Sequence, residues 1–397
     1  MEKVIQPKPL ALSLKKNIFL YIGFISLAII SSYKAPLAFD LPFPGILVFI
    51  LCILLHCCVN HFSAIKIGAI SCLLGLRYVL FFINAIICEV SWEIIIEQCV
   101  TTFISIVVFE CFRNISKDST IIKNVLLIFS LITSVQLIVG YAGDFFADKN
   151  NIAAGIGNSN YVATFLLLSI TFLLFLKTKW YEKLLIVLDV VSLVLTQSFG
   201  AYIAIGIVFV VFIIRNLNWR LLKSWLILLF LIIALVGFFS YFVTTDIGSE
   251  VYEKLRQKII FFLEGDWKNF GSSRLELYEF SWDNIKNNFL FGSIVNYNSS
   301  ISSTYRFQFF RTHNVVLESL LLYGLIGTIL NLAICIILIK KVLNRKKGRK
   351  IFPYIMTIIA VLIHGMVEPN FFTMHFEPFV WMIFGGLMAV VESKGSN

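Results

Sequence analysis

Charged side chains are scarce in this sequence. Only 14% of the 397 residues are Asp, Glu, Lys or Arg, whereas 59% are hydrophobic and the mean hydropathy is +0.88. Soluble globular domains carry about 25% charged residues, so this composition excludes a water-soluble enzyme. Sustained alternation of polar and apolar residues is also missing, which excludes a β-barrel. The composition therefore indicates an all-α polytopic membrane protein.

Apolar segments of about 16 to 25 residues recur along the chain, and this length crosses a hydrocarbon core of about 30 Å. No internal repeat and no soluble domain is visible, so residues 1–397 are expected to form one membrane domain. We expect twelve spanning helices, at residues 17–32, 45–60, 67–87, 97–112, 122–143, 160–176, 184–198, 200–214, 224–243, 315–339, 351–370 and 373–391. Lysines precede the first span and no small-residue cleavage site follows it, so this helix is expected to be retained.

Basic residues gather in alternate connections of this pattern. Examples are "SLKK" at 13–16, "KTKWYEK" at 177–183 and "KKVLNRKKGRK" at 340–350. Because short basic loops stay in the cytoplasm, both termini are predicted to be cytoplasmic. The net charge of +10 is then mostly a topological signal, with some attraction to the anionic lipid bilayer. Nucleic acid is not an expected partner.

Repeated C-x-x-C spacing is absent, although the chain has eight cysteines. Since they lie in or near the expected spans, we interpret them as small apolar packing residues. One cluster combines His56, Cys57, Cys58 and His61, but adjacent cysteines do not give the usual zinc-ligand spacing. No metal and no cofactor are expected.

Residues 244–314 form one long connection on the predicted outer side, and a loop of this length is usually functional or disordered. From Gly248 to Leu263, apolar residues recur on one helical face, which predicts a helix lying on the membrane surface. The stretch "SSRLELYEFSWDNIKNNF" at 272–289 predicts a second amphipathic helix. The loop is therefore expected to be ordered.

The loop returns to the membrane through Arg306, Arg311, His313 and Asn314, where the tenth span begins. The outer face has no nucleotide sugar, so a transferase there needs a donor carried by the membrane, such as a polyprenyl diphosphate glycan. Arginine stabilises a departing diphosphate with a permanent charge, and a helix start favours phosphate. Histidine suits deprotonation of an acceptor hydroxyl near neutral pH. Alternatively, these basic residues only anchor the helix at lipid headgroups.

A cation also lies near the middle of the third span. An unpaired Arg77 there costs at least about 2.5 to 3.5 kcal/mol on insertion scales, so it needs a partner or a wet cavity. One interpretation is a substrate contact to the lipid diphosphate deep in a groove. The other is a structural pairing with a carboxylate such as Glu110 or with the carbonyls of a broken helix.

Two further pairs of polar residues are candidates for substrate binding. His364 and Glu368 are four residues apart on the eleventh span, so they share a face and either line the acceptor cavity or bond each other. Asn158 and Asn160 begin the sixth span and either bind sugar or phosphate or cap the helix. Glu318 lies about 140° around its helix from His313, so direct pairing of these two is not expected.

Four stretches resemble the O-antigen ligase and polymerase superfamily. "HNVVLESLLLYGLIG" at 313–327 is similar to its histidine-asparagine, leucine-rich, double-glycine signature. The others are "SSRLELYEFSWDNIKNNFLFG" at 272–292, "GIGNSNYVATFLLL" at 155–168 and "LTQSFGAYIAI" at 195–205. Together they cover roughly the C-terminal two thirds of the chain in the order expected for the family.

The resemblance implies a multi-pass glycosyltransferase of the bacterial cytoplasmic membrane. Such an enzyme moves a glycan from an undecaprenyl diphosphate carrier to a glycan acceptor on the outer face, with inversion and without metal. His313 would be the base or would orient the acceptor, and Arg274 would contact the diphosphate. A chain-length regulator and a flippase are further implied partners.

One short segment departs from the family pattern. The family often has Ser-Arg-Gly in a short outer turn, whereas this chain has Ser198, Phe199 and Gly200. Either Arg306 or Arg311 replaces the missing cation, or donor binding differs in this protein.

Three functions compete at this stage. The first is polymerisation of lipid-linked repeat units of a surface polysaccharide, and the second is a ligase that joins finished polymer to a lipid A core or another acceptor. The third is a polysaccharide-lipid transporter or flippase. Transporters usually show internal repeats and polar sites at the midplane, whereas this chain concentrates its polar residues in the outer loop, which favours a transferase.

Overall fold

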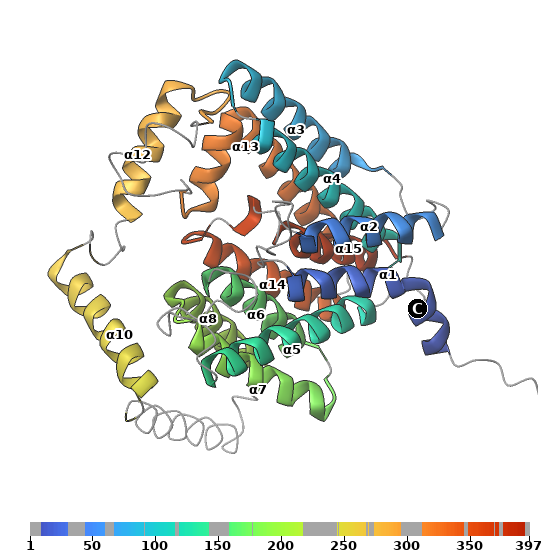
Figure 1. Cartoon of the computed structure of the whole chain (residues 1–397), viewed down its shortest axis with the longest axis vertical. Coiled ribbons are helices and arrows are strands. Elements are labelled where there is room, and N and C mark those ends of the chain that lie inside the picture. The colour runs from blue at the N-terminus through green and yellow to red at the C-terminus, as the bar shows by residue number, and fades with distance from the viewer. Residues whose placement is uncertain are drawn as a thin grey trace, which may run out of the picture.

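A computed structural model describes residues 9–30, 44–59, 67–90, 92–115, 119–142, 159–176, 178–216, 244, 246–266, 269, 274–294, 312–344, 348–368, 370–372 and 376–393. All regular elements in these ranges are helices (Figure 1). They are α1 (Pro9–Ile30), α2 (Pro44–Val59), α3 (Ala69–Ile87), α4 (Trp92–Ile115), α5 (Thr120–Ala142), α6 (Ser159–Leu174), α7 (Trp180–Leu195), α8 (Phe199–Asn216), α10 (Asp246–Glu264), α12 (Arg274–Asn287), α13 (Val315–Leu343), α14 (Gly348–Gly365), the 3-10 helix η3 (Asn370–Phe372) and α15 (Glu377–Glu392).

The prediction of an all-α membrane protein is confirmed at this level. Among the described residues, five helices are long and apolar enough to cross a bilayer: 69–87, 95–114, 120–139, 199–216 and 315–343. Shorter apolar helices cover 17–28, 45–59, 159–174 and 350–365. The expected span at 224–243 lies outside the described residues. The number of twelve spans and the cytoplasmic position of both termini stay predictions.

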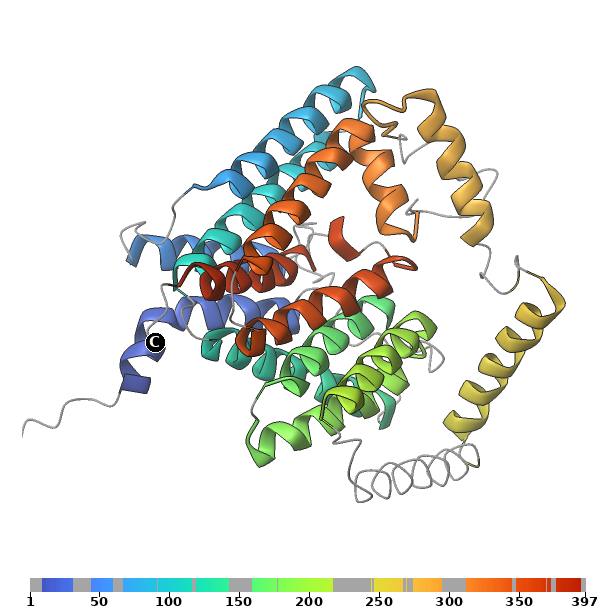
Figure 2. The same cartoon turned by 180° about the vertical axis from the view of Figure 1, so that it is seen from behind.

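The helices are arranged around α14 and α15. Both views show these two helices between a group formed by α3, α4 and α13 and a group formed by α5 to α8 (Figures 1 and 2). Gly385 allows the close approach of α15 to α4, since a Cβ added there would lie 2.5 Å from the carbonyl oxygen of Phe109. Small residues at helix contacts have this role in membrane bundles, where van der Waals packing drives association.

Aromatic side chains fill the centre of the bundle. The ring of Phe379 in α15 lies 4.5 Å from Phe129 in α5, between ring centroids. The same ring lies 4.9 Å from Phe24 in α1 and 4.9 Å from Phe165 in α6. These edge-on contacts add to the packing of buried apolar surface and connect helices that are distant in the sequence.

Helix α13 is broken at Gly324, where φ is +61° and the chain changes direction. The turn that follows α12 fits into this break, and the backbone of Leu325 donates to the carbonyl of Phe289 at 2.9 Å. A Cβ on Gly324 would lie 2.4 Å from the nitrogen of Gly292, so both glycines are required for the approach. Asn84 of α3 donates to the carbonyl of Gly292 at 3.0 Å. The glycines of "FLFG" and "YGLIG" thereby join α12 to the N-terminal part of α13.

Both predicted amphipathic helices of the long connection are present, as α10 and α12. Helix α12 packs on α13, whereas α10 lies at the edge of the molecule, apart from the bundle (Figures 1 and 2). Helix α14 ends at Gly365, earlier than the expected end of the eleventh span. Glu368 therefore lies in the turn after the helix.

Candidate functional site

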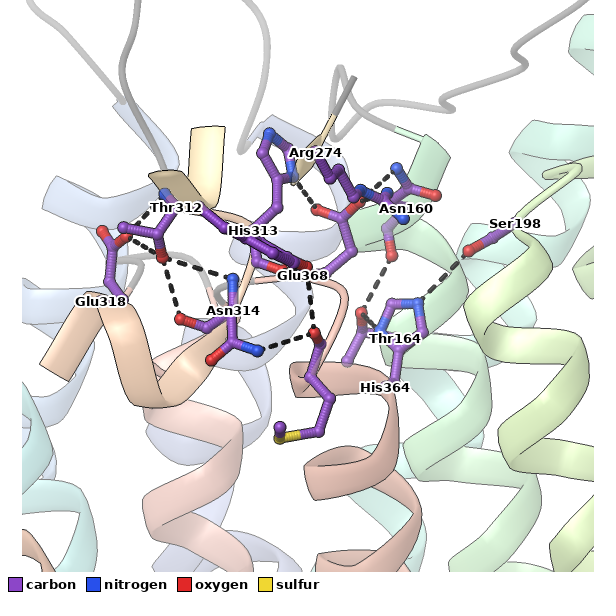
Figure 3. Close-up of polar contacts among 12 residues, drawn as sticks. Asn160, Thr164, Ser198, Arg274, Thr312, His313, Asn314, Glu318, His364 and Glu368 are labelled. Carbon is purple, nitrogen blue, oxygen red and sulfur yellow. Dashed lines mark hydrogen bonds and ion pairs between the residues drawn. The ribbon is translucent and has the colours of Figure 1, made fainter. Parts of the chain in front are cut away.

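Glu368 lies at the centre of a polar cluster, and its side chain is only 1% exposed. Oε1 accepts from Nη2 of Arg274 at 2.8 Å and from Nδ2 of Asn160 at 2.7 Å. Oε2 lies 3.1 Å from Nδ1 of His313 (Figure 3). Arg274 of α12, Asn160 of α6 and His313 before α13, all candidates from the sequence, thus contact the same carboxylate.

The contact with Glu368 determines how the imidazole of His313 can act. A carboxylate paired with arginine offers only acceptors, so Nδ1 of His313 must carry the hydrogen in this contact. In a neutral imidazole, Nε2 is then the nitrogen that can accept a proton. The side chain of His313 is 32% exposed, so a substrate can reach it. A carboxylate that orients a histidine in this way prepares it as a general base.

His313 has a backbone φ of +50°, a conformation that L-residues rarely adopt. The residues on both sides fix this strained position. Thr312 is fully buried, and its backbone N–H donates to Oε2 of Glu318 at 2.9 Å. Asn314 caps α13 by accepting from the N–H groups of Val316 and Leu317, and it donates to the carbonyl of Met366 at 3.1 Å. Strain supported by its surroundings is common at functional sites.

Arg274 is the first residue of α12, and its side chain is 27% exposed. The described bond to Glu368 uses one of the five N–H donors of its guanidinium, so further donors remain for an anion. One turn later, the hydroxyl of Tyr278 donates to the carbonyl of His313 at 3.3 Å. Burial raises the pKa of Tyr278, with a smaller contribution from Glu368, while Arg274 and a hydrogen bond oppose the shift. Tyr278 therefore acts as a neutral donor that connects α12 to His313.

His364 extends the cluster toward α8. Oγ1 of Thr164 donates to the carbonyl of Asn160 at 2.9 Å, so it accepts from Nδ1 of His364 at 3.0 Å. Nε2 of His364 is then left to accept from the hydroxyl of Ser198 at 3.3 Å. The expected shared helical face of His364 and Glu368 is absent because α14 ends at Gly365, and these bonds of His364 go to α6 and to the turn before α8 (Figure 3). This fully buried histidine joins three elements and supports Asn160.

Arg77 lies elsewhere, inside the bundle. Its Nη2 pairs with Oε1 of Glu377 at 3.1 Å, and its Nη1 donates to Asn331 at 3.3 Å. Its guanidinium also lies 4.9 Å from the ring centroid of Tyr323, a cation–π distance. The partner that an intramembrane arginine requires is therefore present. It is Glu377, whereas Glu110 pairs with Arg113 of the last turn of α4.

The remaining predicted residues, Asn158, Arg306 and Arg311, lie outside the described residues. The structure also brings in residues that sequence reasoning did not select as site residues. These are Thr164, Ser198, Tyr278, Thr312 and Glu318. A local signal existed for two of them: Thr164 lies one helical turn after Asn160, and Thr312 directly precedes His313.

In the described part of the chain, no group of three or more His, Cys, Asp or Glu side chains is arranged to hold a metal ion. The chemistry that this cluster offers comes from its own groups. It combines a partly exposed guanidinium with an oriented imidazole, and one buried carboxylate holds both. An anion can bind at the first and a hydroxyl can lose its proton to the second.

Residues 184–332 match a family model described as O-antigen ligase. The match runs from α7 into α13 and includes Arg274, His313 and Asn314. Asn160 and Glu368 lie outside it. Among curated proteins, none matches the chain.

Proposed function

We propose that the protein polymerises a surface polysaccharide, from the premise that residues 184–332 match a family model described as O-antigen ligase. The donor is a glycan linked to undecaprenyl diphosphate, and the acceptor is the hydroxyl of another glycan. The reaction takes place on the outer face of the bacterial cytoplasmic membrane, where the cluster around Glu368 is predicted to lie.

The proposed step is a single displacement at the anomeric carbon. The acceptor hydroxyl gives its proton to Nε2 of His313, and its oxygen forms the new bond to the anomeric carbon. The bond from that carbon to the diphosphate breaks, and the diphosphate leaves with the bonding electrons. Arg274 stabilises this anion, because a guanidinium keeps its charge and aims several donors at phosphate oxygens. Attack from the face opposite the leaving group inverts the anomeric configuration.

The observation that carries the proposal is the shared carboxylate. Glu368 accepts from Arg274 at 2.8 Å and contacts Nδ1 of His313 at 3.1 Å, so an anion-binding group and a base are held side by side. A helix anchored at lipid headgroups needs no buried carboxylate behind its histidine. The side chains of Arg274 and His313 also remain partly exposed.

The test is glycan transfer by the purified protein in lipid. The wild type is incubated with a synthetic polyprenyl diphosphate oligosaccharide, and mass spectrometry measures the product with and without chelator. Lengthened glycan of inverted configuration in both samples is expected. Absence of any transfer from this donor class would contradict the proposal, and loss of transfer with chelator would contradict the metal-free step.

A ligase is the second candidate, and the description of the matched family favours it. The two activities share donor and chemistry but differ in what accumulates when the protein is absent. Cells lacking a polymerase contain carrier-linked single repeats, whereas cells lacking a ligase contain full-length polymer that is not attached. Carrier-linked intermediates extracted from a deletion strain therefore distinguish the candidates.

A further inference from the structure

The cluster around Glu368 has little net positive charge for its proposed ligand. The carboxylate of Glu368 already offsets the charge of Arg274 in the free protein. A diphosphate donor carries a negative charge on each phosphate, and more charge develops as it departs. The site therefore needs further cations close to Arg274.

Helix α10 brings two lysines to this place. Nζ of Lys254 donates to Oε1 of Gln197 in the turn between α7 and α8, at 2.5 Å. One helical turn later, Nζ of Lys258 donates to the carbonyl of Asn269 at 2.7 Å, five residues before Arg274. Although α10 lies apart from the bundle, this face of it is tied to both segments that flank the site (Figure 1).

Lys258 and Arg274 are close enough to repel each other. Burial lowers the pKa of Lys258, and the neighbouring positive charge of Arg274 lowers it further. Like charges held near one another by the fold disfavour the empty site and favour one that contains an anion. Lys258 thus has the position and the charge expected of an anion-binding residue.

Lys254 contacts the short turn in which this sequence departs from the family pattern. Its ammonium group lies at Gln197, two residues before Phe199, in the turn where the family often has an arginine. Gln197 has φ of +53°, a left-handed backbone conformation that L-residues rarely adopt. Helix α10 therefore supplies a cation to a turn whose own residues lack one.

We propose that Lys254 and Lys258 of α10 complete, together with Arg274, the subsite that binds the diphosphate of the donor. The inference rests on the proposed function, because it assigns a further part of the same site. In this proposal, Lys254 of the long connection takes the place of the cation that the turn before α8 lacks.

Arg256 provides a matched control on the same helix. It lies between the two lysines in the sequence but pairs with Glu253 at 3.3 Å, and its side chain is more than half exposed. Changing it to glutamine removes the same unit of charge from α10 without touching the bonds of Lys254 or Lys258. A general effect of surface charge would therefore appear in this variant as well.

The experiment measures equilibrium binding of undecaprenyl diphosphate and undecaprenyl monophosphate in nanodiscs of neutral phosphatidylcholine. The proteins are the wild type, Lys254→Gln, Lys258→Gln, Lys258→Arg and Arg256→Gln. Loss of one charged hydrogen bond weakens binding about tenfold, and we expect this for the diphosphate in both glutamine variants. Lys258→Arg and Arg256→Gln should bind like the wild type, and the preference for diphosphate over monophosphate should fall only in the two glutamine variants.

Unchanged diphosphate affinity in Lys254→Gln and Lys258→Gln, or an equal loss in Arg256→Gln, would overturn the inference. Thermal unfolding of each variant checks that the fold is intact. Glycan transfer by the same wild-type discs tests the proposed function separately. Discs that bind the diphosphate through the lysines but never transfer glycan would refute the function and leave the subsite standing.

Discussion

Two of the arginine–glutamate pairs among the described residues differ mainly in what surrounds them. Arg77 and Glu377 form the inner pair, with side chains 3% and 2% exposed. Arg274 and Glu368 form the outer pair, in which the carboxylate is equally buried but the arginine is 27% exposed. The inner pair is enclosed by the indole of Trp381, which donates to Glu377, and by the ring of Tyr323. The same two residue types therefore form an enclosed pair inside the bundle and, at the candidate site, a pair whose arginine is accessible.

The comparison shows that burial alone does not indicate the role of a carboxylate, because the role depends on its partners. In the inner pair every described partner stabilises the packed helices, as is usual for ions in an apolar environment. In the outer pair the carboxylate also orients an imidazole that substrate can reach. Function is therefore expected to follow the exposed partner, and stability the enclosed one.

The largest effect is expected when the exposed partners are removed. His313→Ala and Arg274→Ala should each lower glycan transfer by about a thousandfold, since one loses the base and the other the main contact to the leaving group. Protein levels should stay normal, because Asn160 still donates to Glu368 in both variants. Chain length of the cell-surface polysaccharide and in vitro transfer measure the effect. Polymer of wild-type length in both variants would overturn the assignment.

The next effect concerns the inner pair and should appear in stability. Arg77→Met leaves the buried Glu377 without its charge partner, a change that costs about 3 to 5 kcal/mol in buried pairs. Adding Glu377→Met should restore much of this loss, because no lone charge remains. Thermal unfolding in detergent measures both variants. If Arg77→Met instead stops transfer in protein of normal stability, Arg77 is a substrate contact and the comparison fails.

Glu368→Gln tests whether the outer carboxylate acts through His313. The amide oxygen can still accept from Arg274 and Asn160. The amide nitrogen, which then faces His313, is a donor and cannot accept from Nδ1, so the imidazole is no longer oriented. We expect kcat to fall about a hundredfold, within the range for general base catalysis, with a smaller change in KM. A structural role alone would lower the melting temperature and leave kcat per folded molecule unchanged.

Gly324→Ala addresses the element that links the two pairs, and its effect is expected in stability rather than in the chemistry of the site. The outer half of α13 follows His313, and the inner half carries Asn331, which bonds Arg77. Alanine at φ of +61° costs about 1 to 2 kcal/mol, and contact with the turn at Gly292 adds to this. Gly75→Ala is the control, because a Cβ there meets no atom within 4 Å and should not destabilise α3. Equal melting temperatures for both variants would contradict the proposed role of the break.

The helices were predictable because their apolar runs are long and their boundaries polar. The ends were less so: the eleventh span was expected to reach residue 370, but α14 ends at Gly365 and Glu368 falls in a turn. Hydropathy does not mark that end, since apolar residues continue beyond it. His313 was selected from its chemistry and from the family resemblance, and Arg274 from the resemblance alone; their roles stay predictions.

The partners of these residues were not predictable from local patterns. Glu368 is 94 positions from Arg274 and 55 from His313, and helical spacing gives no information at such distances. For the same reason Glu110 was considered for Arg77, whereas the actual partner, Glu377, is 300 positions away. Periodicity predicts which side chains share a face, but only the packing of α12, α13 and α14 determines which faces meet.

The docking of the "FLFG" turn against Gly324 has a consequence for how this protein can diversify. Ile294, just after the turn, is 4% exposed, and Thr312, just before His313, is 0% exposed. The two residues that flank positions 295–311 are thus buried by contacts outside that segment, whatever its sequence. Under the proposed function, insertions or exchanges between them are expected to change glycan specificity while the imidazole of His313 keeps its place.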